Sequence, residues 1–237
     1  MDNTLPYFPD QKLLFIHIPK NAGKSVEMAL GLDKTLSDLY RLGRRGIANR
    51  AAVLLQRLTA PSQARRRLHG VLDVTLTAQH LTFQEIRLLN LAPAEGVRSF
   101  AVIRDPFERA VSTFLHVGNR DGGGGPEAFE DFCLRWFDLP HPDHNLMALS
   151  RRQIDFVRDC DGRIGVDRLL PQSRLGTALA EMFAEWGLPA RSLGHEGNQT
   201  RGRNVDHWMT GRARAMIAER FAEDIELHAA VESGRLG

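Results

Sequence analysis

The sequence predicts an α/β fold in which helices cover both faces of a central parallel sheet. Residues 13–18, LLFIHI, and residues 97–103, VRSFAVI, are almost continuous apolar runs of strand length. Such runs are typical of strands that are buried on both faces. Each run passes through a short loop into a segment with helical spacing, and this repeated pattern predicts parallel strands joined by helices. The 237 residues are expected to form one domain, 1–237.

The first strand, 13–18, is followed by the loop PKNAGK and a helix that is expected to start near Ser25. Such a junction aims backbone N–H groups and a helix N-terminus at an anion. Lys20 and Lys24 lie in this loop, although the chain has only four lysines against 27 arginines. Cations at a helix N-terminus oppose the helix dipole, so their position here favours an anion bound between them.

The second strand, 97–103, ends in RDPFERAVSTF, whose proline suits the first turn of a helix. Arg104 at the strand end can offer a fork of donors to a phosphate. Ser112, two helical turns further on, can present a hydroxyl to the same place. Arg109 either joins them or pairs near the neighbouring glutamate. Two such loops on one sheet edge predict a ligand with two separated phosphate groups.

Further helices and turns are expected along the rest of the chain. Thr82 and Glu85 form a capping-box pattern before an apolar stretch, so a helix is expected to start near Thr82. The other expected elements are a helix from Pro126, a hairpin or two short strands at 153–157 and 163–167, a helix at 171–189, a polar loop at 195–204, and a final helix at 211–231 capped by Thr210.

The composition is that of a globular protein that is not polycationic overall. The net charge is +2, and 43% of the residues are apolar. Cys133 and Cys160 are too few for a disulfide framework, which favours a reducing compartment. The first residues lack a signal-peptide pattern, and no run approaches the ~20 apolar residues of a membrane helix. We therefore expect a cytoplasmic protein.

One segment is strongly basic, because residues 41–70 contain eight arginines and no acidic residue. We expect a loosely specified helical insertion over about 35–70. It either attracts an anionic acceptor, such as a glycan or the lipid headgroups of a membrane surface, or is an ordinary solvated face. Aromatic residues are absent from it, so stacking on nucleic acid is disfavoured and no nucleic-acid partner is expected.

The first loop also invites comparison with the ATP-binding pattern G-x-x-x-x-G-K-[ST]. Gly23, Lys24 and Ser25 fit the end of that pattern, but Ile18 stands where its first glycine is needed. A β-branched residue fits poorly in a tight turn around a phosphate, and Pro19 removes a donor N–H from the loop. An ATP-dependent P-loop phosphotransferase is therefore kept as an alternative.

Three stretches together resemble the sulfotransferases that use 3′-phosphoadenosine 5′-phosphosulfate (PAPS). They are FIHIPKNAGKS, QHLTF and VIRDPFERAVSTF, and the similarity is closest to the branch of carbohydrate (uronosyl 2-O-type) sulfotransferases. The later RRQIDFV, RIGVDRLL and GLP…GNQTRGRN extend the resemblance to about residues 12–228. It implies a P-loop-NTPase-like central parallel sheet flanked by helices. The chain departs from the family's usual TAGTS, because it has NAGKS with Lys24.

The resemblance also implies ligands and residue roles. The donor would be PAPS with no metal, and the acceptor a hydroxyl of a sugar or anionic substrate. Lys20 would stabilise the departing phosphate and His80 would be the base, with His17 second and Glu27 a more distant candidate. The donor would be held by Lys20, Asn21, Ala22, Gly23, Lys24 and Ser25 at its 5′-phosphosulfate, by Arg104 and Ser112 at its 3′-phosphate, and by a loop with Asn198, Arg201 and Arg203.

Two other interpretations concern metal binding and loss of catalysis. His141 and His144, with one aspartate between them, lack further ligands at the spacing of a zinc motif, so no metal is expected. His144 or Asp155 would instead contact the acceptor. A non-catalytic nucleotide-binding module of the same fold is a further alternative, which the presence of both Lys20 and His80 disfavours.

Overall fold

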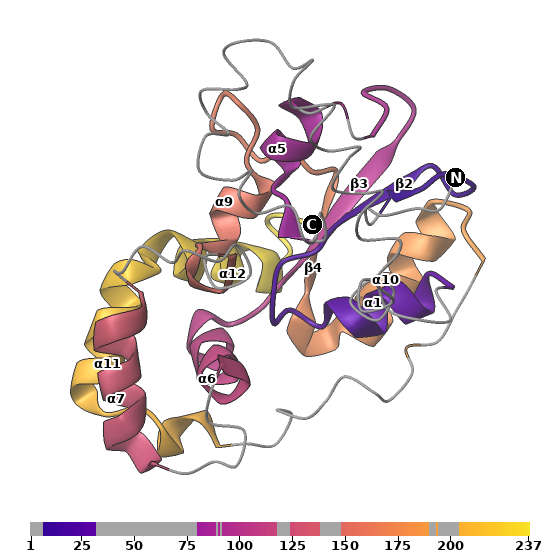
Figure 1. Ribbon diagram of the computed structural model, residues 1–237. Coiled ribbons are helices and arrows are strands. Elements are labelled where there is room, and N and C mark those ends of the chain that lie inside the picture. Colours follow the sequence, from indigo (N-terminus) through magenta and orange to yellow (C-terminus); the bar gives the residue numbers. More distant parts are fainter. Residues whose placement is uncertain are drawn as a thin grey trace, which may run out of the picture.

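The computed structural model describes residues 7–31, 80–88, 90, 92–117, 124–137, 148–189, 193 and 204–237. These residues contain one four-stranded sheet (Figure 1). In spatial order its strands are β1 (Tyr7–Phe8), β2 (Leu13–Ile16), β3 (Arg98–Ile103) and β4 (Arg168–Pro171). β2 pairs with β3, and β3 with β4, in parallel, whereas β1 is an antiparallel edge strand. The predicted α/β class is confirmed, and the two residues of β1 are too few to give a sequence signal.

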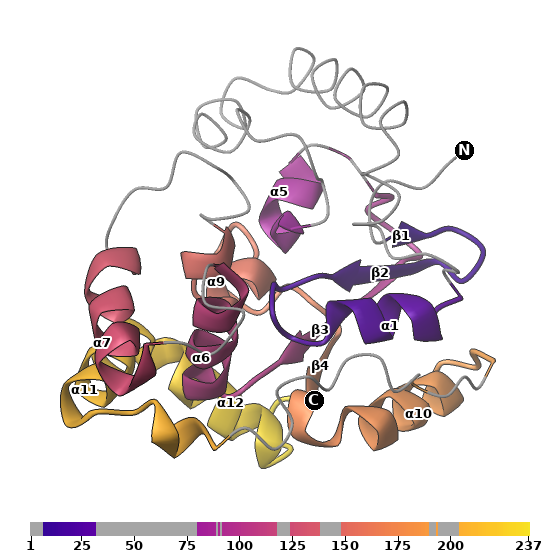
Figure 2. The ribbon, with the colours of Figure 1, turned by 60° about the horizontal axis from the view of Figure 1, so that its bottom comes forward.

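Side chains that alternate along the strands divide the core between the two faces of the sheet. Leu14 and Ile16 pack on one face, and Leu13 and Phe15 on the other. Because both faces are covered, the strand reads as a continuous apolar run. The first face is covered by α5 (Phe83–Leu88), α9 (Gln153–Val157) and α12 (Ala222–Glu232), and the second by α1 (Gly23–Ala29) and α10 (Leu175–Glu185) (Figure 2).

A third apolar cluster packs around the helix that follows β3. It joins α6 (Pro106–Val117), α7 (Gly125–Trp136) and α11 (Gly211–Arg220). The ring of Phe114 lies 5.4 Å from that of Phe129 and 5.5 Å from that of Trp208, between centroids. Aromatic packing of this kind buries a large apolar area and prefers such edge-to-face geometry. It anchors α6, and with α6 the loop at the end of β3.

The predicted strand at 153–157 is wrong, because this segment is helix α9. Its first N–H groups are satisfied by a residue from α12. The two carboxylate oxygens of Asp224 accept from the N–H of Gln153 at 2.7 Å and from the N–H of Ile154 at 2.9 Å. A carboxylate distant in the sequence therefore caps the helix, so the residues next to the helix start do not indicate the cap.

The predicted strand at 163–167 is also wrong. Only Ile164 pairs, in an isolated antiparallel bridge with Arg158. The turn expected between the two segments does form, since Asp159 Oδ1 accepts from the N–H groups of Asp161 and Arg163. The third parallel strand is β4, which begins at Arg168 and takes its register from β3. The sequence of β4, RLLP, has only two aliphatic residues, which is too short an apolar run to be recognised without that partner strand.

The predicted caps at two helix starts are confirmed. The N–H of Thr82 donates to Glu85 Oε2 at 2.8 Å, and the N–H of Glu85 donates to Thr82 Oγ1 at 3.1 Å. Before α11 comes the 3₁₀ turn η5 (Val205–His207), and then Thr210 Oγ1 accepts from the N–H of Ala213 at 3.0 Å. These signals are local, because both partners lie within three residues of each other.

Two predicted helices are interrupted, and two others start slightly early. Residues 171–189 contain the end of β4, the 3₁₀ turn η3 (Gln172–Arg174) and then α10. The final helix breaks at Phe221 into α11 and α12, and the buried ring of Phe221 packs against that of Phe137 with centroids 4.9 Å apart. α1 begins two residues, and α7 one residue, before the predicted start.

Both cysteines are free thiols. Burial, with a smaller contribution from the charge of Glu130, raises the pKa of the Cys133 thiol to about 12. Cys160 is exposed. Cys133 is therefore a packing residue of the third cluster and not a nucleophile.

The junction between β2 and α1 depends on the absence of a side chain at Gly23. The imidazole of His17 is buried against this glycine, and a Cβ at position 23 would lie 1.9 Å from His17 Nε2. The imidazole is itself held, because Nδ1 bonds Glu27 Oε1 of α1 at 2.7 Å and the ring stacks on Phe15. Any larger residue at position 23 must therefore displace the imidazole or the loop.

We predict that Gly23→Ala lowers the free energy of unfolding by about 1–3 kcal/mol, the usual cost of overpacking a filled interior. Gly211→Ala is the matched control, since Gly211 is also the first residue of a helix and a Cβ there meets nothing within 4 Å. Urea unfolding followed by circular dichroism measures both variants. Equal stabilities would show that His17 does not constrain the loop.

Candidate active site

Two loops meet at the carboxyl ends of β2 and β3. Residues 17–22 join β2 to α1, and Arg104 with Asp105 joins β3 to α6. Arg104 Nη1 donates to the carbonyl oxygen of Lys20 at 3.0 Å, so a side chain of the second loop binds the backbone of the first. The carboxyl edge is where open α/β sheets bind ligands. The structure thus brings the two loops singled out in the sequence to one place.

The backbone of the first loop is suited to an anion. Lys20 and Ala22 have φ angles of 70° and 62°, in the left-handed region that residues with side chains rarely adopt. In the described part of the chain, the N–H groups of residues 22–25 have no backbone acceptor. Successive N–H groups in a turn of this kind form a concavity that binds anions. Lys24 is exposed on the first turn of α1, and Ser25 is buried.

The side chain of Asn21 holds the first loop to the sheet. Its Nδ2 donates to the carbonyl of Val102 in β3 at 2.7 Å and to Gln153 Oε1 at 2.6 Å. Its Oδ1 is buried and has no hydrogen-bond partner among the described residues. Asn21 was expected to bind the donor, and the structure commits the amide nitrogen of its side chain to the interior.

Arg104 is almost fully buried at the end of β3. Besides the bond to the first loop, its Nε and Nη2 donate to Glu108 Oε2 at 3.1 Å and 3.0 Å. The Glu108 side chain is 43% exposed, so this carboxylate lies on the solvent side of the pair. Ser112 is buried in the second turn of α6. A guanidinium held in this way has a fixed direction and can recognise a phosphate.

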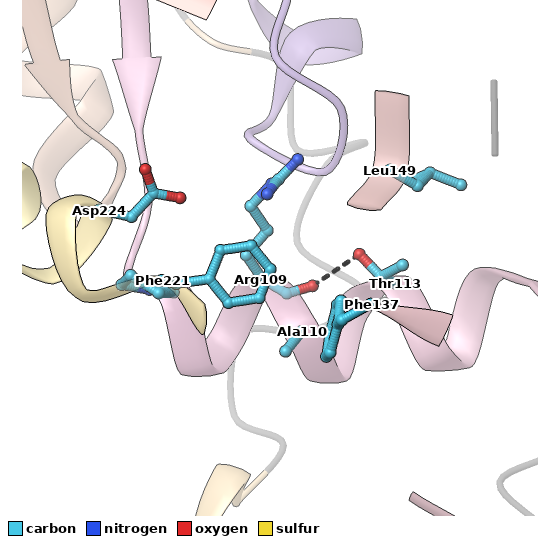
Figure 3. Close-up of a pocket in the computed structure, with 8 residues that line it drawn as sticks. Arg109, Ala110, Thr113, Phe137, Leu149, Phe221 and Asp224 are labelled. Atoms are coloured by element: carbon cyan, nitrogen blue, oxygen red, sulfur yellow. Dashed lines mark hydrogen bonds between the residues drawn. The ribbon is translucent and has the colours of Figure 1, made fainter. Parts of the chain in front are cut away.

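Arg109 supports the first loop through hydrogen bonds to backbone carbonyls. From α6 it donates through Nε to the carbonyl of Pro19 at 3.1 Å, and through Nη1 to the carbonyl of Arg151 at 2.9 Å. Figure 3 shows the side chain rising from α6 toward the β2–α1 loop. Burial lowers the pKa of Arg109 to about 10, with Asp224 opposing the shift and Arg104 adding to it. Arg109 therefore stays charged at neutral pH, and its donors are used within the protein.

A narrow crevice adjoins Arg109 on the side of α6 and α12. It is too narrow to hold a water molecule and is lined by Pro106, Arg109, Ala110, Thr113, Phe137, Leu149, Phe221 and Asp224 (Figure 3). Burial raises the pKa of the Asp224 carboxyl, against the opposing effects of Arg109 and of two backbone N–H groups. Its two charged residues are committed to the backbone, since Arg109 donates to the Pro19 carbonyl and Asp224 accepts from the N–H of Gln153.

Gln153 connects the two loops, and the sequence did not single it out. It is fully buried at the start of α9. Its Nε2 donates to the carbonyl of Arg104 at 2.8 Å, and its Oε1 accepts from the N–H of Arg104 at 3.0 Å as well as from Asn21. In the sequence RRQIDFV, Gln153 stands among other polar residues and so gives no distinct signal. Asp224, which fixes the backbone of Gln153, gave no signal among the charged residues of α12.

His80 approaches the first loop from the residues that precede α5. Its Nδ1 lies 3.1 Å from the carbonyl oxygen of His17. Because a carbonyl only accepts, Nδ1 carries the hydrogen, and in the neutral ring Nε2 then has the lone pair. The rings of His17 and His80 meet edge to face with centroids 4.8 Å apart. His17 and Glu27 are both buried and bonded to each other, whereas His80 is partly exposed.

Several expectations fall outside the described residues. These are Asn198, Arg201, Arg203, His141, His144 and the basic insertion at about 35–70. Asp155, proposed to contact the acceptor, forms an ion pair with Arg152 at 2.8 Å. Within the described ranges, no three histidine, cysteine or carboxylate side chains gather as a metal site would require. No described helix is both long enough and apolar enough to cross a bilayer.

Comparison with known proteins identifies the family. The family model described as "Sulfotransferase family" matches residues 4–132, more than half of the chain. The match spans both loops, His80, Arg104 and Ser112. No curated protein and no solved structure gave a significant match. The chain belongs to the sulfotransferase family.

Proposed function

We propose that the protein transfers a sulfuryl group from PAPS to a hydroxyl of a carbohydrate acceptor. The observation that carries the proposal is the bond from Arg104 to the Lys20 carbonyl, which holds two phosphate-binding elements at one edge of the sheet. PAPS carries two separated anionic groups, a 5′-phosphosulfate and a 3′-phosphate. A site with two anion-binding elements suits such a donor, and family membership supports sulfuryl transfer as the chemistry.

We propose the following residue roles. The loop from Lys20 to Ser25 holds the 5′-phosphosulfate with its N–H groups, and Lys20 stabilises the charge that develops on the leaving phosphate. Arg104 and Ser112 bind the 3′-phosphate, and Asn198 with Arg201 closes over the nucleotide. The positively charged groups stabilise the charge on the leaving group without a metal ion, and the basic insertion attracts the acceptor.

His80 acts as the base. The acceptor oxygen attacks sulfur in line with the leaving group while its proton moves to His80 Nε2. The bond between sulfur and the bridging oxygen breaks, and adenosine 3′,5′-bisphosphate leaves with the bond's electron pair. The bond between His80 Nδ1 and the His17 carbonyl fixes the tautomer that this step needs.

The ATP-dependent alternative is disfavoured by the position of Ile18. This residue is 1% exposed and belongs to the core cluster on the α5–α9–α12 face of the sheet. An ATP-binding loop needs glycine at that position to wrap around a phosphate. The buried side chain of Ile18 instead holds the start of the loop in the core. The remaining loop offers a smaller anion-binding site than an ATP-binding loop does.

We predict that adenosine 3′,5′-bisphosphate stabilises the protein and that ATP with Mg²⁺ does not. At about 100 times its Kd, a ligand that binds only the native state contributes about 2.7 kcal/mol. In a chain of this size that energy raises the thermal midpoint by about 5–10 °C. Differential scanning fluorimetry against buffer measures the shift.

Arg104→Ala should lose most of this shift. Arg98→Ala is the matched control, because Arg98 lies exposed at the opposite end of the same strand. A shift with ATP and Mg²⁺ alone would overturn the proposal and favour a kinase-like phosphotransferase. Equal shifts for Arg104→Ala and the native chain would remove Arg104 from the site.

We predict that His80→Ala lowers kcat by about 10²–10⁴-fold, the usual contribution of a general base. The thermal shift with the bisphosphate should stay unchanged, because His80 serves the acceptor and not the donor. Release of bisphosphate with a sugar acceptor found by screening measures the rate, and His207→Ala, at an exposed histidine, is the control. A full rate in His80→Ala would assign the base elsewhere.

A further inference from the structure

We infer that Gln153 is a positioning residue that gives the site its preference for a donor with a 3′-phosphate. The inference rests on the proposed function, because it concerns how Arg104 recognises that group. Gln153 is fully buried, so it acts through Arg104 and not by contact with the donor.

The side chain of Gln153 forms hydrogen bonds with both backbone groups of Arg104. Its Nε2 donates to the Arg104 carbonyl at 2.8 Å, and its Oε1 accepts from the Arg104 N–H at 3.0 Å. A side-chain amide thereby bonds the backbone of the first residue after β3, whose last strand residue, Ile103, pairs with Pro171 of β4. The amide satisfies both backbone groups because it carries N–H donors and an acceptor oxygen on one side chain. Glutamate has the acceptors without the donor, and methionine has neither.

The same amide is tied to the first loop and to α12. Oε1 also accepts from Asn21 Nδ2 at 2.6 Å, and the Gln153 N–H donates to Asp224 Oδ2 at 2.7 Å. The backbone bond to Asp224 holds the residue in place whatever its side chain is. The side-chain bonds then set the separation between Asn21 in the first loop and Arg104 in the second.

Because the backbone of Arg104 is held in place, the position and direction of its guanidinium are also held. Arg104 donates to Lys20 and to Glu108, and these bonds require the side chain to start from one position. A shift of the backbone moves every donor of the guanidinium, so the bonds to Lys20 and Glu108 no longer keep the same geometry. Binding of the 3′-phosphate should suffer, whereas binding of the 5′-phosphate to the N–H groups of the first loop should not.

The test compares two ligands that differ only in the 3′-phosphate. Isothermal titration calorimetry gives Kd values for adenosine 3′,5′-bisphosphate and for adenosine 5′-monophosphate. The ratio of the two is the readout, because a merely looser fold weakens both ligands alike and leaves the ratio unchanged. The native chain should prefer the bisphosphate by about 10–100-fold, the worth of hydrogen bonds to a charged group.

Gln153→Glu and Gln153→Met should reduce this preference to within about threefold, the loss of the same charged hydrogen bonds. Gln153→Glu keeps the acceptor for Asn21, whereas Gln153→Met keeps a similar volume without placing a charge in the buried site, so the two variants are complementary. Gln172→Met, at a partly buried glutamine of η3, is the control and should keep the native ratio. In a double variant with Arg104→Ala, the Gln153 substitution should not change the ratio further, because both substitutions remove the same interaction between Arg104 and the 3′-phosphate.

The outcomes separate the inference from the proposed function. A native chain without any preference for the bisphosphate would overturn the proposed donor, and the inference with it. A native preference that survives in both Gln153 variants would overturn the inference alone. Additive effects of Gln153→Glu and Arg104→Ala would show that Gln153 acts on another part of the site.

Discussion

The side-chain amide of Gln153 bonds both the N–H and the carbonyl of Arg104, and the geometry of the candidate site depends on this pair of bonds. Asp224 holds the backbone of Gln153, and Asn21 extends the network to the first loop. Every one of these groups is buried. Leaving one of them unpaired costs about 1–3 kcal/mol, so the network favours a single arrangement of the two loops.

The same network places two arginines close together beneath the loops. Burial lowers the pKa of Arg109 to about 10 and the positive charge of Arg104 adds to the shift, yet Arg109 remains protonated at neutral pH. Arg109 donates its hydrogen bonds to backbone carbonyls, whereas Arg104 also donates to the carboxylate of Glu108, which is partly exposed. Nearby carboxylates offset the repulsion between the two guanidinium groups, because Asp224 opposes the shift at Arg109 and Glu108 pairs with Arg104.

Much of the fold was predictable, because its signals are local or periodic. The apolar runs of β2 and β3 reflect burial on both faces, and the capping box before α5 needs only residues three positions apart. The strand predicted at 153–157 failed for the opposite reason. Its helical state is stabilised by Asp224, about 70 residues away, and the short strand β4 takes its register from β3.

By itself, the sequence determined the α/β class, the two loops at the ends of β2 and β3, and the family to which the chain belongs. Motif residues such as Gly23 and Arg104 are visible in the sequence because they occupy fixed positions relative to a strand and a helix. Only the tertiary structure decided that Gln153 joins the loops and that His17 fills the space at Gly23. Those contacts link residues from separate elements, and burial makes each of them specific only once the sheet has brought the elements together.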